Sequence, residues 1–462
     1  MSRVAAIALM LATLGLMPLR AAALNLSLEQ AVALAKRQNR EILIAQKQIE
    51  AAHGGVIEAH SGFMPSVVSS GLLRQREQQE QSRFRGDDYN ASLRVVQNVY
   101  NGGAIKARTA IARLNEEKRR LELNAIVARV SMDVRVAYYD LLLNRAKIDV
   151  RLQSVRVMEE ELKSQQERFV AGTVGELNVR RADVALANEQ PELVEAQTRL
   201  QNSYLRVNEL CGIDATKAAH VPRIEPTGRL EYSPRHPDLV ECLGRAGAAR
   251  PEIRAREIDV EIEEQQLIID RSELRPRVEA FTGYEVYSER DPAVGSEFNH
   301  GYVVGLNASW HIFDGYATRG RMLATQARHD AAAQALEAAK LSVESEVRSA
   351  FYDIQQADRV LQSETQNVQN ASESLEIARG NLGAGLGTQL DVLQAAADVT
   401  RTRTTRLSAI YLHNVALARL ARATAREPET LGFAAKTATV EEAKQQAKLF
   451  DMAQPPAALD AR

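Results

Sequence analysis

The chain has 462 residues and a mass of 51.0 kDa, and its 58 basic and 60 acidic side chains leave a net charge of −2, whereas nucleic-acid-binding proteins are usually basic. Hydrophobic residues make up 45% of the chain and aromatic residues only 5%, with little glycine and proline, which favours long helices over an all-β sandwich. Two cysteines exclude a disulfide-rich scaffold and a four-cysteine zinc site.

Residues 1–23 have the pattern of an export signal. Arg3 supplies a positive charge, residues 4–17 form a short apolar run, and residues 21–23 are alanines that suit a cleavage site. An N-terminal membrane anchor is the alternative interpretation. The mature chain is expected to begin at Leu24, outside the cytoplasm. Because no later apolar run reaches about 18 residues, any membrane-spanning part would have to consist of strands.

The rest of the chain is an internal duplication. Matching segments recur in the same order, with a spacing that changes by two residues in one loop only: Glu41-Ile42 and Glu252-Ile253, Pro65 and Pro276, Tyr100-Asn101-Gly102 and Phe313-Asp314-Gly315, and Tyr138-Tyr139-Asp140 and Phe351-Tyr352-Asp353. Each half is therefore expected to form one structural repeat. The first covers residues 24–212 and the second 237–426, with a connector at 213–236 and a tail at 427–462.

Each repeat reads as helix, strand, strand, helix, helix. The capping box Ser27–Gln30 predicts the start of a helix that continues towards Gly62. Pro237 suits the first turn of the matching helix in the second repeat.

The predicted strands cover about residues 66–76 and 89–100, and then 277–288 and 301–313. In the clearest strand, Leu93, Val95 and Val99 share one face, and Arg94 and Asn98 lie on the other. Trp310 falls on the apolar face of the matching strand. One apolar and one polar face suit a strand between lipid and water, and a half-buried soluble hairpin is the alternative.

Two long helical hairpins are predicted, at about residues 103–211 and 316–426. Apolar residues at alternating steps of three and four form a coiled-coil seam: Val127, Val130, Val134, Ala137, Leu141, Ile148, Val155, Met158 and Leu162, and later Val343, Val347, Ala350 and Ile354. Pro191 lies inside the first returning helix and predicts a local kink.

The hairpins turn near residues 171–175 and 384–388. The tip residues are Gly172, Thr173, Val174 and Gly175 in the first repeat, and Gly385, Leu386, Gly387 and Thr388 in the second. The pairs Thr173–Glu176 and Thr388–Asp391 both have the spacing of a capping box. Gly383, Gly385 and Gly387 follow a helix and not a strand, which argues against a phosphate-binding loop.

No catalytic or metal-binding motif stands out. The eight histidines are scattered without a His-Glu-x-x-His pattern, His329 is expected on a solvated helix surface, and no nucleophile elbow occurs. We therefore expect no enzyme activity, no metal and no cofactor. Cys211 and Cys242 could form a disulfide in an oxidising compartment, which the sequence alone leaves open.

The duplicated order, the strand-to-helix junctions at Tyr100-Asn101-Gly102-Gly103 and Phe313-Asp314-Gly315, and the segment from Gly385 to Leu393 resemble the TolC-like outer-membrane efflux protein family over about residues 27–426. The resemblance implies a mostly α-helical homotrimer. Four strands per chain would form a twelve-stranded outer-membrane β-barrel in contact with lipid, and the helices would continue it as an α-helical barrel across the periplasm.

The same resemblance implies an exit duct that works with a periplasmic adaptor and an inner-membrane transporter, and no nucleic acid. It places adaptor docking at the two tips and a periplasmic aperture at Asp391. A second family acid is replaced by Gln394, and the other hairpin has Asn178. The capping box is the competing role for Asp391. A periplasmic coiled-coil adaptor or structural envelope protein remains the alternative function.

Overall fold

The computed structural model describes residues 24–75, 87–213, 224–288 and 299–426. The backbone of these residues packs into two units. The sheet unit contains the described residues up to 144 together with 197–228 and 246–346, and the tip unit contains 145–196, 229–245 and 347 onward. The predicted export signal and C-terminal tail lie outside the described residues.

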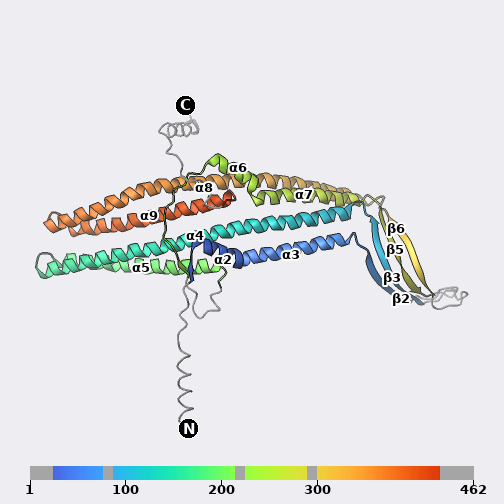
Figure 1. Ribbon diagram of the computed structural model, residues 1–462, viewed down its shortest axis with the longest axis horizontal. Helices are drawn as coiled ribbons and strands as arrows, with labels where there is room; N and C mark the ends of the chain where they lie inside the picture. Colours follow the sequence, from blue (N-terminus) through green and yellow to red (C-terminus); the bar gives the residue numbers. More distant parts are fainter. Residues whose placement is uncertain (1–23, 76–86, 214–223, 289–298, 427–462) are drawn as a thin grey trace, which may run out of the picture. The chain divides into compact units, whose positions relative to one another are not determined.

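Among the described residues, each half of the chain contains one three-residue strand, two shorter helices, two longer strands and two long helices. Figure 1 labels the helices and the four longer strands. The first half has β1 (Leu24–Leu26), α2 (Leu28–Gln38), α3 (Arg40–Ser61), β2 (Ser66–Gln75), β3 (Asp87–Tyr100), α4 (Ala104–Val170) and α5 (Glu176–Leu210). The second has β4 (Ile224–Pro226), α6 (Leu239–Ala249), α7 (Pro251–Ser272), β5 (Arg277–Tyr287), β6 (Asn299–Ser309), α8 (Ala317–Ala384) and α9 (Gln389–Ala423).

The first predicted helix is two helices, because Asn39 interrupts it. The capping box at Ser27 begins α2, as predicted. Asn39 then adopts an extended conformation, and its side-chain oxygen accepts a hydrogen bond from the backbone nitrogen of Glu41 at 2.9 Å. Its side-chain amide donates to the carbonyl oxygen of Leu210 at 2.8 Å. The break therefore anchors this helix pair to the end of α5.

The second repeat is interrupted at the corresponding place by a different residue. Pro251 is the first residue of α7, where its missing N–H costs nothing. The preceding Arg250 is buried and forms ion pairs with Glu252 at 3.0 Å and Glu346 at 2.8 Å. Pro237 is not in the first turn as predicted, since α6 begins at Leu239.

A two-stranded parallel sheet, β1 with β4, joins the start of the first repeat to the connector. Tyr138 on α4 fixes this sheet, because its buried hydroxyl lies 2.9 Å from the carbonyl oxygens of both Leu26 and Thr227. Tyr138, the first residue of the Tyr138-Tyr139-Asp140 segment, therefore has a structural role at the connector.

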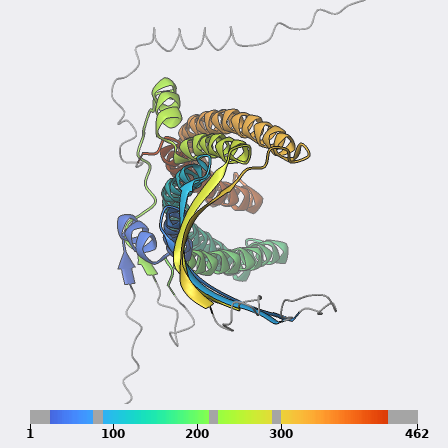
Figure 2. The ribbon, with the colours of Figure 1, turned by 90° about the vertical axis from the view of Figure 1, so that its right-hand side faces the viewer.

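The larger sheet contains four antiparallel strands in the order β2-β3-β5-β6. Figure 2 shows that this sheet is strongly curved. Register places apolar residues of all four strands on one face, and most of these are exposed: Val67, Leu73, Leu93, Val95, Tyr284, Tyr302, Val304 and Leu306. The other face, called the polar face below, carries Ser70, Ser92, Arg94, Glu279 and Glu285, interspersed with apolar residues: Val68, Leu72, Val96 and Val303.

The last strand is shorter than predicted. β6 ends at Ser309, whose partner Arg277 is the first residue of β5, so residues 310–313 have no adjacent strand to pair with. Trp310 consequently lies just beyond the strand. Its indole nitrogen donates to the carbonyl oxygen of Leu274 at 3.0 Å, and its ring stays exposed.

The long helices α4 and α8 have 67 and 68 residues, which corresponds to about 100 Å at 1.5 Å per residue. The predicted seam is buried at Val130, Val134 and Leu141, and at Val347 and Ile354 of the second repeat. α5 continues through Pro191. Within the described residues, no helix is apolar over a length that would cross a membrane.

Candidate functional site

The first tip is a tightly bonded helix end. The backbone nitrogen of Gly172 bonds the carbonyl oxygen of Phe169 at 2.9 Å, and that of Thr173 bonds Arg168 at 2.9 Å. This is the Schellman pattern, which needs a left-handed residue. Gly172 supplies it with φ of 71°. The glycine is therefore required by the turn itself.

Thr173 does not cap the returning helix, so the predicted capping box Thr173–Glu176 is wrong. Its hydroxyl donates backwards to the carbonyl oxygen of Arg168 at 2.9 Å. The Schellman turn places Thr173 above the last turn of α4, so the Arg168 carbonyl accepts from both the backbone nitrogen and the hydroxyl of Thr173. Glu176 instead pairs with Arg180 at 3.2 Å.

The second tip uses the same helix end, followed by a capping box. Gly385 has φ of 74°, and the backbone nitrogen of Leu386 bonds the carbonyl oxygen of Asn381 at 2.8 Å. Thr388 then caps α9, as predicted. The nitrogens of Gly385 and Gly387 also bond carbonyl oxygens of α8. Since these N–H groups already have partners, this glycine segment cannot cradle a phosphate.

A hydrogen bond joins the two tips of one chain. The buried side chain of Gln389 donates from its amide nitrogen to the carbonyl oxygen of Asn178 at 2.9 Å. Both residues belong to the tip unit. The sequence does not predict this contact, and its one signal for it is that the two residues lie in the equivalent first turns of α5 and α9. The tips are therefore held as a pair.

Large apolar side chains are exposed around both turns. Val170 is 86% exposed and Leu386 is 82% exposed, although both are large apolar side chains. Phe169, Leu177 and Leu390 are also exposed. Gly175 has open space where a Cβ would stand. Clustered exposed apolar groups on a rigid turn are typical of a surface that contacts another protein.

Asp391 is engaged as a cap in the structure. One carboxylate oxygen accepts from the backbone nitrogen of Thr388 at 2.8 Å and from its hydroxyl at 2.7 Å. These hydrogen bonds from the Thr388 hydroxyl and backbone lower the pKa of Asp391 below its ordinary value. Gln394 is exposed one turn later, and Asn178 contributes its carbonyl to the tip contact described above.

Both cysteines are free, buried thiols, so the structure does not contain the disulfide that the sequence left open. The thiol of Cys211 lies 3.7 Å from the carbonyl oxygen of Ala31, and burial raises its pKa to about 11. Burial, with the nearby charge of Glu241, also raises the pKa of Cys242. Neither thiol is activated for nucleophilic chemistry.

A buried polar cluster in the tip unit was not predicted. His413 is fully buried, with Nδ1 2.7 Å from a carboxylate oxygen of Asp358 and Nε2 3.1 Å from the carbonyl oxygen of Ser233. The Tyr232 hydroxyl also donates to Asp358 at 3.1 Å, and burial together with the Asp358 charge raises the pKa of Tyr232 to about 12. The cluster holds the connector against α8 and α9.

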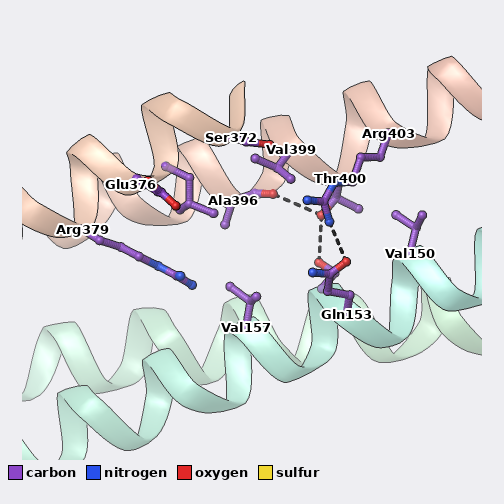
Figure 3. A pocket seen from close by; sticks show the side chains of 12 residues that line it. Val150, Gln153, Val157, Ser372, Glu376, Arg379, Ala396, Val399, Thr400 and Arg403 are labelled. Carbon is purple, nitrogen blue, oxygen red and sulfur yellow. Dashed lines mark hydrogen bonds between the residues drawn. The ribbon is translucent and has the colours of Figure 1, made fainter. Parts of the chain in front are cut away.

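A cavity of about 240 Å³ lies among α4, α8 and α9 within the tip unit, and Figure 3 shows its lining. The hydroxyl of Thr400 lies 3.1 Å from that of Ser154, and Arg403 donates to Gln153 at 2.6 Å. The lining contains no histidine or cysteine. Within the part of the chain that the structure describes, no cluster of three metal-ligating side chains occurs.

Comparison with known proteins agrees with this geometry. The family model described as outer membrane efflux protein matches residues 31–213 and 242–426. The chain is 22% identical to outer membrane protein TolC of Vibrio cholerae, covering 78% of this chain and 82% of that protein. It is 22% identical to the cobalt-zinc-cadmium resistance protein CzcC of Cupriavidus metallidurans, covering 83% of this chain and 86% of that protein.

A solved structure extends the comparison to the fold. The CmeC outer membrane channel of Campylobacter jejuni superposes with a TM-score of 0.76 at 14% identity, covering 91% of this chain and 89% of that chain. The family model spans both repeats and includes the tips, the capping box at Thr388 and the buried seam. This chain therefore belongs to the outer membrane efflux protein family and is an outer-membrane protein with a long periplasmic helical part.

Proposed function

We propose that this protein is the passive exit duct of a tripartite efflux or secretion system. It works as a homotrimer with a periplasmic adaptor and an inner-membrane pump. Membership of the efflux family supports a channel rather than an adaptor or a structural envelope protein. The observation that carries the proposal is the four-stranded sheet, because it has an exposed apolar face and two open edges.

The edges explain why several chains are needed. Among the described residues, β2 and β6 each have a neighbouring strand on one side only. Four strands are too few to close a barrel, and an open edge in lipid leaves backbone groups without partners. Three copies of the curved sheet seen in Figure 2, paired edge to edge, would remove every edge, and the apolar face would then be turned towards lipid.

The tips support the proposed partners. Each chain offers two similar glycine turns, held together by Gln389 and surrounded by exposed apolar side chains. A trimer would present six such turns to an adaptor. Passive operation is supported by the glycine segment after α8, whose N–H groups are bonded to the helix and do not offer a nucleotide site.

The experiment that tests the proposal is reconstitution of the purified protein. In detergent we expect a trimer of roughly 150 kDa before detergent is counted, three times the chain mass of 51.0 kDa. In planar bilayers that trimer should conduct ions without nucleotide. Light scattering, circular dichroism and conductance measure these properties. A monodisperse monomer that keeps its helicity but never conducts would contradict the proposal.

Two substitutions at Asp391 separate the helix cap from an aperture role. Asp391→Ala should speed amide exchange at the start of α9, because it removes the acceptor for Thr388. Asp391→Asn keeps an acceptor oxygen, so exchange should change less. If capping is the main role, Asp391→Asn changes channel conductance by less than about twofold, since a single exposed charge is screened by salt. A large conductance increase in Asp391→Asn with unchanged exchange would instead assign the aperture role.

The capping role of Asp391 also predicts how the stability of the second tip depends on pH. The pKa of Asp391 is lowered in the folded tip, so the cap is fully present above the ordinary aspartate pKa. Its contribution is lost as the pH falls through the lowered value. After division by the intrinsic exchange rate at each pH, protection at the second tip should therefore fall only in acid in the wild type, and Asp391→Ala should show no such step.

A further inference from the structure

The polar face of the four-stranded sheet carries one ion pair between its two central strands. Arg94 on β3 pairs with Glu285 on β5. The same face carries other charges near the strand ends, at Arg74, Arg277 and Glu279, and Arg277 pairs with Glu273, the residue that follows α7. Arg94 lies midway along β3, and Glu285 stands two residues before the end of β5, so a pore lined by this face would contain both charges.

An aromatic ring supports the arginine. The guanidinium carbon of Arg94 lies 5.4 Å from the ring centroid of Phe281, on the same face. A cation over an aromatic face is stabilised by the ring quadrupole. The neighbouring Ser70 and Ser92 hydroxyls lie 2.8 Å apart, so this part of the face is polar on β2 as well. Arg94 is therefore fixed from two sides, by Glu285 and by Phe281.

Two glycines make room for this arrangement. Gly283 faces Arg94 across the strand pair, and a Cβ at Gly283 would lie 2.9 Å from the Arg94 Cα and overlap the carbonyl of Leu93. Gly305 faces Phe281, and a Cβ there would lie 2.6 Å from the ring. The ring and the arginine stem lie flat on the sheet because both opposing positions lack side chains. The ion pair is therefore part of a packed group of residues on β3, β5 and β6, together with Phe281, Gly283 and Gly305.

We propose that Arg94 and Glu285 keep the channel unselective for charge, because their paired ring leaves this level of the lumen without net charge. The proposal rests on the trimeric duct proposed above, in which the polar face lines the lumen and three pairs stand at one level. An unpaired ring of like charges biases a narrow aqueous pore towards ions of opposite sign. Mutual neutralisation lets solutes of either charge pass.

Reversal potentials in a salt gradient test the pair. Arg94→Gln leaves three unpaired glutamates and should shift the permeability ratio towards cations by about threefold in dilute salt. Glu285→Gln should shift it towards anions by about the same factor. The double variant, which removes both charges, should return to the wild-type ratio. A pair that does not face the conducting lumen would leave the ratio unchanged in all three variants, and that result overturns the proposal.

The charge swap Arg94→Glu with Glu285→Arg covers the case in which a single variant fails to assemble. The swapped pair should give a heat-resistant trimer with a permeability ratio near that of the wild type. A swapped or double variant that assembles but keeps a ratio shifted by threefold or more would overturn the proposal. Wild-type protein that forms no channel at all would refute the duct itself, which distinguishes the two failures.

Discussion

In the trimeric duct proposed above, Leu386→Glu and Gly175→Trp should each abolish export while leaving the trimer in the outer membrane. Leu386 projects from the second tip with 82% of its surface exposed, and Gly175 has open space at the first tip. Both changes alter only the outer surface of a turn whose backbone bonds are already made. Burying a carboxylate, or a large ring, at a packed contact costs more than most interfaces tolerate, so adaptor binding should weaken by roughly a hundredfold.

The geometry also decides which tip variants are informative. A side chain at Gly387 would stand 3.0 Å from the Cβ of Asn381, so Gly387→Trp would disturb the turn itself. Leu386 avoids this problem, because its side chain already points into solvent. Adaptor cross-linking and cargo export are the measurements, with outer-membrane trimer as the assembly check.

A matched control is available away from the tips. Val240 on α6 is 77% exposed, and Val240→Glu adds the same charge to a comparable aliphatic position. Export and cross-linking at the wild-type level in Val240→Glu, with both lost in Leu386→Glu, would locate docking at the tips. Wild-type export in both tip variants would mean that the adaptor binds elsewhere.

Features that depend on local sequence were predictable. The length of α4 and α8 follows from stretches without proline, and the buried seam follows from apolar residues at steps of three and four. The cap at Thr388 follows from its spacing to Asp391. In each case the stabilising partner lies within a few residues or on a repeating helix face, so the sequence pattern alone is enough to predict the feature.

Features that depend on a distant partner were not predictable. Asn39 breaks a helix because it bonds the carbonyl of Leu210, which lies in another helix. Thr173 has the spacing of a capping residue, but the left-handed Gly172 turns its hydroxyl towards Arg168 instead. The Arg94–Glu285 pair depends on strand register, which a sequence with long connecting segments does not define.

The end of each returning helix provides an internal comparison between the repeats. Both α5 and α9 finish in a Schellman turn: Ile213 bonds Asn208 at 2.9 Å, and Arg426 bonds Ala421 at 2.8 Å. The left-handed residue is Gly212 in the first repeat, with φ of 70°, but Ala425 in the second, with φ of 52°. The second repeat therefore accepts a backbone cost of about 1 kcal/mol that the first avoids.

The neighbours of each turn explain why the first repeat has glycine there and the second has alanine. Exchanging the two residues should therefore have opposite effects on stability, with Gly212→Ala destabilising and Ala425→Gly stabilising. A Cβ at Gly212 would overlap the carbonyl of Gln38, next to the Asn39 break that joins α2 and α3 to α5. Gly212→Ala should therefore lower the free energy of unfolding by about 3 kcal/mol or more, from left-handed strain and overlap together, and lower the apparent unfolding temperature of the protein sharply. Gly172→Ala is the matched control, because Gly172 has φ of 71° with no neighbour within 4 Å, so it should cost only the strain of about 1 kcal/mol. Ala425→Gly should raise the unfolding temperature slightly, since it relieves the same strain. Equal losses in Gly212→Ala and Gly172→Ala would show that the contact with Gln38 is not tight and that the strain of the turn alone explains the glycine.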